Sequence, residues 1–183
     1  MRAFIAIDFS DETKREIIKI QNDIKQHALS GRWKRKDNFH LTLKFLGEIT
    51  PGMADKIVSL MNNVAIGHRQ FDLKFDKIGF FKGKDNFRVV WLGMQNHNEA
   101  LYNLQADVEE TSGMLGFKNE KRFSPHITLG QDVRLDIPFE ELESTVKIDI
   151  KPLIVDAFCL MDSRVINGKR VYTPIKQFEL LGR

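Results

Sequence analysis

The sequence lacks the features of secreted, membrane-spanning and disulfide-stabilised proteins. Its 183 residues include one cysteine, so no disulfide can form within the chain. No apolar run approaches the ~20 residues of a transmembrane helix, and residues 1–9 lack the apolar core and cleavage site of a signal peptide. We therefore expect a soluble, cytoplasmic protein with no membrane partner, in which Cys159 is a small buried apolar residue.

A strong excess of one charge is also missing. The 28 Lys and Arg residues face 25 Asp and Glu residues, for a net charge of +3. That excess is too small for a protein that coats long nucleic acids. An acidic partner must then be bound by local basic clusters, which occur at residues 32–36, 118–122 and 164–170. Most such runs are solvated surface, so none of them alone indicates a site.

Proline and glycine punctuate the chain without forming a linker. The five prolines and twelve glycines are scattered, so we expect residues 1–183 to form a single domain. Capping residues followed by apolar positions at helical spacing predict three helices, which begin after Ser10, Thr50 and Asn98. The apolar stripe of the first helix extends to Ala28.

Short apolar or alternating segments predict strands between these helices. They cover residues 2–8, 41–46, 71–75, 88–94, 127–131 and 152–160. The dipeptide Asn167-Gly168 favours a type I′ turn, and therefore an antiparallel hairpin. Helices interspersed among antiparallel strands predict an α+β fold.

One four-residue pattern occurs twice, as His40-Leu-Thr-Leu43 and His126-Ile-Thr-Leu129. Random placement would produce two such matches in only about 5 of 10,000 chains of this composition. Alternate side chains of a strand share a face, so each copy would place its His and Thr together and bury its two apolar residues. We expect two rigidly mounted imidazole and hydroxyl pairs facing each other across a groove.

Two histidines and two threonines arranged in this way suit a displacement reaction at phosphorus. That reaction needs a base, an acid on the opposite side, and donors for the oxygens that accumulate charge. Zinc is the main alternative, but two histidines fall one short of a catalytic zinc site. Cys159 has no neighbouring base that would make it a nucleophile. We therefore expect neither a metal nor another cofactor.

The residues around both motifs carry a family resemblance. It covers Arg32 to Glu48, the opening segment Arg2 to Asp8, the run Val90-Trp-Leu-Gly93, and the stretch from Gly116-Phe117 through Phe123-Ser-Pro-His-Ile-Thr-Leu129. In these segments the chain resembles the two-histidine (2H) phosphoesterase superfamily, and within it the bacterial and archaeal RNA 2′,3′-cyclic phosphodiesterases, once called 2′-5′ RNA ligases.

The resemblance implies a fold and an activity. The fold would have two pseudo-symmetric lobes of antiparallel sheet, with helices on the outer faces, around a central cleft. The activity would be metal-independent hydrolysis of an RNA terminal 2′,3′-cyclic phosphate to a 2′-phosphate. By motif position, His40 would be the proton donor and His126 the proton acceptor, with Thr42 and Thr128 on the phosphate.

Further substrate contacts are expected beside the motifs. We assign substrate binding to four residues: Arg35, Phe45, Lys121 and Arg122. Relatives commonly have Arg two residues beyond the second motif, where this chain has Gln131. The positive charge that this Arg would place near the phosphate must then come from Lys121, Arg122 or Arg134.

Two other functions stay open at this point. A 2′-5′ RNA ligase would run related chemistry in reverse, with an RNA 5′-hydroxyl in place of water. A non-catalytic module that binds RNA ends would keep the basic and aromatic residues without needing both histidines. In each case the partner is an RNA or oligonucleotide end, and we expect a monomer.

Overall fold

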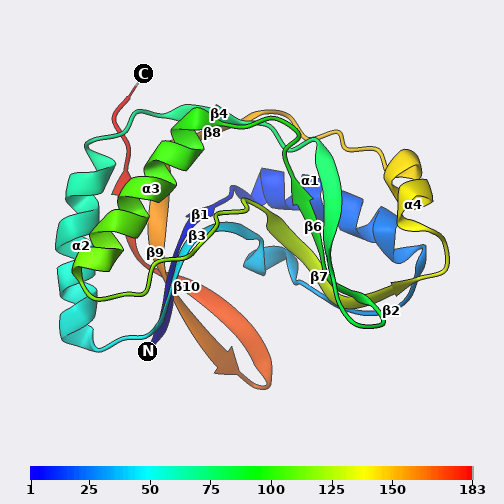
Figure 1. The fold of residues 1–183 in the computed structure, drawn as a ribbon, viewed down its shortest axis with the longest axis horizontal. Helices are drawn as coiled ribbons and strands as arrows, with labels where there is room; N and C mark the ends of the chain where they lie inside the picture. The colour runs from blue at the N-terminus through cyan, green and yellow to red at the C-terminus, as the bar shows by residue number, and fades with distance from the viewer. Residues whose placement is uncertain (183) are drawn as a thin grey trace.

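The computed structural model describes residues 1–182 and consists of two antiparallel sheets backed by helices (Figure 1). The first sheet has the order β10 (Lys169–Glu179), β9 (Ala157–Ile166), β1 (Arg2–Asp8), β3 (His40–Glu48). The second has the order β2 (Ala28–Trp33), β7 (Ile127–Leu135), β6 (Phe87–Gly93), β5 (Lys77–Lys82). A small sheet pairs β4 (Phe71–Leu73) with β8 (Leu153–Val155).

Helices cover the outer face of each sheet (Figure 1). Helices α2 (Pro51–Ala65) and α3 (Glu99–Met114) contact the first sheet. Helices α1 (Asp11–Lys25) and α4 (Phe139–Thr145) lie on the second, and a short 3₁₀ helix, η1 (Lys36–Asn38), precedes β3. The α+β fold of two antiparallel lobes is thereby confirmed. Because α1 follows β1 but packs on the other sheet, the lobes are interwoven along the chain.

The three predicted helices begin where their caps indicate. The side chains of Ser10 and Thr50 accept from backbone N–H groups three residues later, and Asn98 does the same for Leu101 at 3.0 Å. The predicted extension of α1 to Ala28 is wrong, because the helix ends at Lys25 and Ala28 opens β2. There it pairs with Leu135 of β7, and these sheet hydrogen bonds replace the continued helix.

The strands agree with the sequence pattern in part. The predicted strand over residues 152–160 is two strands, β8 and β9, separated at Asp156. Strands β2 and β5 and helix α4 were not predicted, because their residues show no clear period. The Asn167-Gly168 turn is confirmed: both residues have positive φ, at 50° and 73°, and they join β9 to β10.

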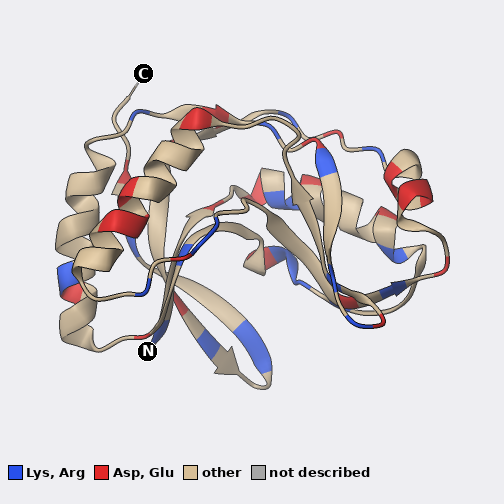
Figure 2. Ribbon diagram, in the orientation of Figure 1, with Lys and Arg blue, Asp and Glu red and all other residues tan. Residues whose placement is uncertain are grey.

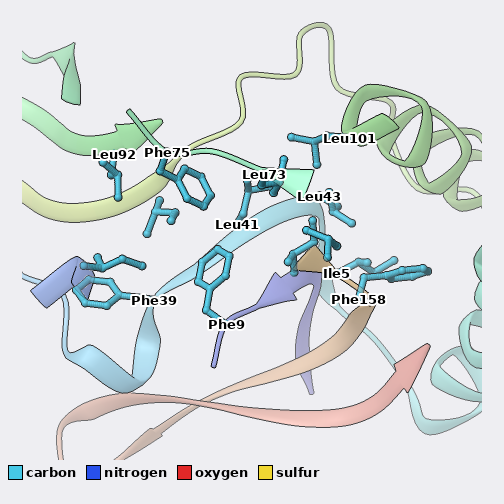
Figure 3. Close-up of a cluster of buried hydrophobic side chains, with 14 of the residues drawn as sticks. Ile5, Phe9, Phe39, Leu41, Leu43, Leu73, Phe75, Leu92, Leu101 and Phe158 are labelled. Atoms are coloured by element: carbon cyan, nitrogen blue, oxygen red, sulfur yellow. The ribbon is translucent and has the colours of Figure 1, made fainter. Parts of the chain in front are cut away.

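One continuous hydrophobic core lies behind both sheets (Figure 3). It joins Ile5 and Leu41 of the first sheet to Leu92 of the second, with Phe9 and Phe75 meeting edge to face between them. The four apolar motif residues are at most 3% exposed: Leu41, Leu43, Ile127 and Leu129. The core therefore anchors both motif strands. No helix within residues 1–182 is long and apolar enough to cross a bilayer.

Candidate active site

The two motifs share a local distortion as well as a sequence. In β3, Thr42 pairs with Ala6 and Lys44 with Ile5, so Leu43 is an extra residue in its strand. In β7, Thr128 pairs with Trp91 and Gly130 with Val90, so Leu129 is the extra residue. Each motif thus ends in a β-bulge at its fourth position, and the bulge shifts the alternation of the side chains that directly follow it.

The bulge decides which residues return to the motif face. Without it, Lys44 would share a face with His40 and Thr42; with it, Lys44 is buried and Phe45 is 64% exposed beside Phe4. The equivalent of Phe45 in the second strand is Gln131. These two residues occupy matching positions two places beyond each motif.

A groove of about 520 Å³ runs between the two motif strands. Its lining includes both histidines, both motif threonines, Phe45 and Gln131. It further includes ten residues that come mostly from β1, β2 and the β9–β10 hairpin: Arg2, Ala3, Phe4, Arg32, Lys34, Asn38, Gly47, Ser163, Arg170 and Tyr172. The structure therefore brings together the four residues with predicted chemical roles and one predicted substrate contact.

Three other predicted substrate contacts lie elsewhere. Arg35 is exposed and its guanidinium lies 3.5 Å from Asp37. Lys121 and Arg122 line a separate open pocket beside α3. Arg134, the alternative source of charge, is exposed on β7 and is not among the groove-lining residues. The substrate roles of all four stay predictions.

His40 is held by its own strand and ringed by aromatic side chains. Its Nδ1–H donates to the Asn38 carbonyl at 2.8 Å, which leaves Nε2 facing Thr42 Oγ1 at 3.1 Å. The rings of Phe4 and Tyr172 lie 4.8 and 5.0 Å away. Burial lowers the pKa of His40 to about 4, although the bond to Asn38 favours the charged ring.

His126 repeats this arrangement from the second sheet. Its Nδ1–H donates to the Ser124 carbonyl at 2.7 Å, so Nε2 carries no proton in the neutral ring. The Phe81 and Trp91 rings lie 5.0 and 6.4 Å from the imidazole. The indole lies so close over Gly79 that a Cβ there would come within 2.2 Å of it. Burial lowers the pKa of His126 as well.

The cations of the groove are ones that the sequence reasoning did not single out. Arg2, Arg32, Lys34 and Arg170 line it. The Nζ of Lys34 lies 5.7 Å from the centroid of the Tyr172 ring, and its charge also lowers the pKa of His40. Arg32, Lys34 and Arg170 fall in the basic clusters at residues 32–36 and 164–170. These clusters are the sequence feature from which the three cations could have been predicted.

Arg32 lies directly across the sheet from Gln131. The two residues are cross-strand partners on β2 and β7. The Arg32 Nε–H donates to Asp132 at 3.0 Å. The groove thus has a cation directly opposite Gln131, supplied by the neighbouring strand.

Lys44, the residue that the bulge buries, connects the two motifs. Lys44, 1% exposed at its side chain, pairs with the carboxylate of Glu109 on α3 and donates to the Lys118 carbonyl at 2.7 Å. The same carboxylate accepts from the Glu120 N–H at 2.7 Å. The strand of the first motif thereby anchors the loop that leads to His126.

Other nucleophilic and metal-binding groups do not gather at the groove. Within residues 1–182, no three His, Cys, Asp or Glu side chains come together as a metal site. Cys159 is buried, as expected, and burial raises its pKa to about 11. The thiol is therefore protonated at neutral pH and a poor nucleophile.

Comparison with known proteins agrees with this geometry. A model of the family described as LigT like Phosphoesterase matches residues 7–91 and 92–172. The RNA 2′,3′-cyclic phosphodiesterase of Escherichia coli (strain K12) is 32% identical over 187 residues, covering 98% of this chain and 96% of that protein. The RNA 2′,3′-cyclic phosphodiesterase of Thermotoga maritima is 29% identical over 182 residues, covering 100% and 97%.

Solved structures show the same fold. The crystal structure of E. coli LigT complexed with 3′-AMP matches with a TM-score of 0.80 and 30% identity, over 98% of both chains. The family match spans both motifs and most of the chain. The chain therefore belongs to the LigT-like phosphoesterase family.

Proposed function

We propose that this protein hydrolyses the terminal 2′,3′-cyclic phosphate of RNA to a 2′-phosphate, by acid-base catalysis between His40 and His126. The family and the names of its relatives support the cyclic phosphodiesterase activity. The division of labour between the two histidines follows the motif positions of the family that the chain resembles, in which the first histidine donates a proton and the second accepts one.

In the proposed reaction, Nε2 of His126 accepts a proton from water as the water oxygen attacks phosphorus. The bond from phosphorus to the 3′ oxygen breaks, and that oxygen takes the proton from Nε2 of His40. The hydroxyls of Thr42 and Thr128 donate to the non-bridging oxygens, where charge accumulates. Solvent then returns the proton from His126 to His40, and the products are a 2′-phosphate and a 3′-hydroxyl.

One observation carries this proposal: both imidazoles are fixed in the same tautomer. Each Nδ1–H is held by the carbonyl two residues earlier, at 2.8 Å for His40 and 2.7 Å for His126. Each Nε2 is thereby left to exchange protons with a ligand in a groove that both residues line. Two histidines with purely structural roles would not both need Nδ1 held by a carbonyl and Nε2 turned to the same groove.

The test is to incubate the protein with an oligoribonucleotide that ends in a 2′,3′-cyclic phosphate and to follow the terminus by phosphorus NMR. We expect a 2′-phosphate, because an acid beside the 3′ oxygen makes that oxygen leave. A 3′-phosphate would exchange the roles of the two histidines. Joining to an added RNA 5′-hydroxyl would indicate a ligase, and binding without conversion would indicate an end-binding module.

A further inference from the structure

The β9–β10 hairpin continues beyond the first sheet. Strand β1 pairs with β9 only as far as Asp162, so residues 163–172 form a ribbon of two strands. Figure 1 shows this ribbon projecting from the body of the molecule. An isolated two-stranded ribbon is only marginally stable, but Asn38 of η1 holds the β10 strand of this ribbon by donating to the Arg170 carbonyl at 2.9 Å.

One face of the ribbon continues the groove. Ser163 pairs with Tyr172 and Val165 with Arg170, and alternate residues share a face. Arg170 donates to Ser163 Oγ at 3.1 Å, as expected of residues on one face. Ser163, Arg170 and Tyr172 line the groove, whereas no residue of β5 or β6 does so. The groove is therefore extended on the hairpin side of the histidines.

The ribbon has the charge and the surface to bind a polyanion. Residues 163–173 contain three cations and no Asp or Glu. Arg170 lies on the groove face, whereas Arg164 and Lys169 lie on the opposite face, where Arg164 pairs with Asp162. Figure 2 shows Lys and Arg on both strands of the ribbon. Val165 is 61% exposed on the groove face, so apolar surface lies beside Arg170. Five residue steps along the ribbon cover about 17 Å, more than the length of one nucleotide.

We propose that the groove face of this ribbon binds the single-stranded RNA that precedes the cyclic end, with Arg170 on a backbone phosphate and Val165 against a sugar or base. This inference rests on the proposed function and narrows its substrate. The protein acts on oligonucleotide ends in preference to free cyclic mononucleotides. Phosphate and apolar contacts of this kind do not read base edges, so we expect binding with little dependence on base sequence.

The experiment compares a 2′,3′-cyclic mononucleotide with a short oligoribonucleotide that ends in the same nucleotide. Val165→Asp places a carboxylate opposite Arg170, on the groove face. Its matched control, Ile166→Asp, makes the same charge change at a 50% exposed neighbour that faces away. We expect Val165→Asp to raise KM for the oligonucleotide about three- to tenfold and to leave the mononucleotide unchanged. Ile166→Asp should alter both substrates less than about twofold.

Several outcomes would overturn the inference. They are equal losses in the two variants, an equal loss on both substrates, or no loss with Val165→Asp. Wild-type protein gives a second measurement without any variant: kcat/KM should fall more steeply with salt for the oligonucleotide than for the mononucleotide. If neither substrate is hydrolysed, the proposed function fails. Fluorescence anisotropy with a labelled oligonucleotide that ends in a 2′-phosphate would then still test binding to the ribbon.

Discussion

The two lobes present the same motif with the same bulge, yet they place their histidines in different surroundings. His40 lies against Phe4 and Tyr172, its Nε2 contacts Thr42, and its pKa falls to about 4. His126 lies against Phe81 and Trp91, and within the described chain it is not hydrogen-bonded to Thr128. A pseudo-symmetric pair can thus support two different proton roles, because the environment of each imidazole sets its proton affinity.

Removing either imidazole should have the largest effect. His40→Ala and His126→Ala should each lower kcat by about 10² to 10⁴, the usual contribution of an acid or base. Both variants should fold, since each ring borders the groove. The matched control is His97→Ala, an exposed histidine that is not among the groove-lining residues. Near wild-type turnover in either motif variant would refute the two-histidine mechanism.

The two motif strands also differ outside the groove: the first has Lys44 where the second has Gly130. Lys44→Met leaves the Glu109 carboxylate, 14% exposed, without its cation, so we expect the free energy of unfolding to fall by about 3 kcal/mol. Urea denaturation measures this loss. The exposed Lys118→Met is the matched control, and equal stability of the two variants would mean that the buried ion pair does not hold the loop.

The motif threonines should differ in importance although they occupy equivalent positions. Thr42→Val removes both a phosphate donor and the contact at 3.1 Å to His40 Nε2, so kcat/KM should fall about a hundredfold. Thr128→Val removes a donor only and should cost about tenfold. Steady-state kinetics of the two variants decides this, and equal losses would show that the contact to His40 is unimportant in catalysis.

The pH dependence should reveal the buried histidine. Burial keeps both imidazoles neutral in the free protein at pH 7, whereas the proposed reaction needs His40 protonated. As pH falls below 6.5, the form with His40 protonated and His126 neutral becomes more common, and it declines again where both rings are protonated. We therefore expect kcat/KM to be greatest between pH 4 and 6.5, with limbs that belong to the coupled pair. A kcat/KM that rises steadily from pH 5 to 8 would contradict this assignment.

Chelation should have no effect at all, since side chains of the two lobes are proposed to supply every proton and charge. Exhaustive treatment with EDTA should leave kcat unchanged, and added Mg²⁺ or Zn²⁺ should not raise it. Loss of activity that one metal restores would return zinc to consideration. Wild-type kinetics before and after dialysis is the measurement.

Much of the fold was readable because local signals agreed with it. The caps at Ser10, Thr50 and Asn98 and the Asn167-Gly168 turn act within a few residues, and all four appear in the structure. Strand β2 was missed because its residues Ala28–Trp33 are mostly exposed and show no alternation. Its pairing with β7, some hundred residues away in sequence, defines it as a strand.

The sequence by itself determined the chemical groups of the site. Repetition of His-x-Thr-x, with two apolar anchors in each copy, was sufficient to select His40, Thr42, His126 and Thr128, because alternation along a strand is a local rule. The same reasoning assigned Arg35, Lys121 and Arg122 to the substrate from their nearness in sequence, and the structure places all three outside the groove-lining residues.

Only the tertiary structure decided what surrounds those groups. The bulges after Thr42 and Thr128 are set by pairing with β1 and β6, and they turn Phe45 and Gln131 toward the groove. The cations Arg2 of β1, Lys34 just after β2, and Arg170 of β10 reach it from segments that are distant in sequence. Register and burial depend on contacts between strands, so the sequence could name the side chains proposed to react but not the environment that sets their pKa values.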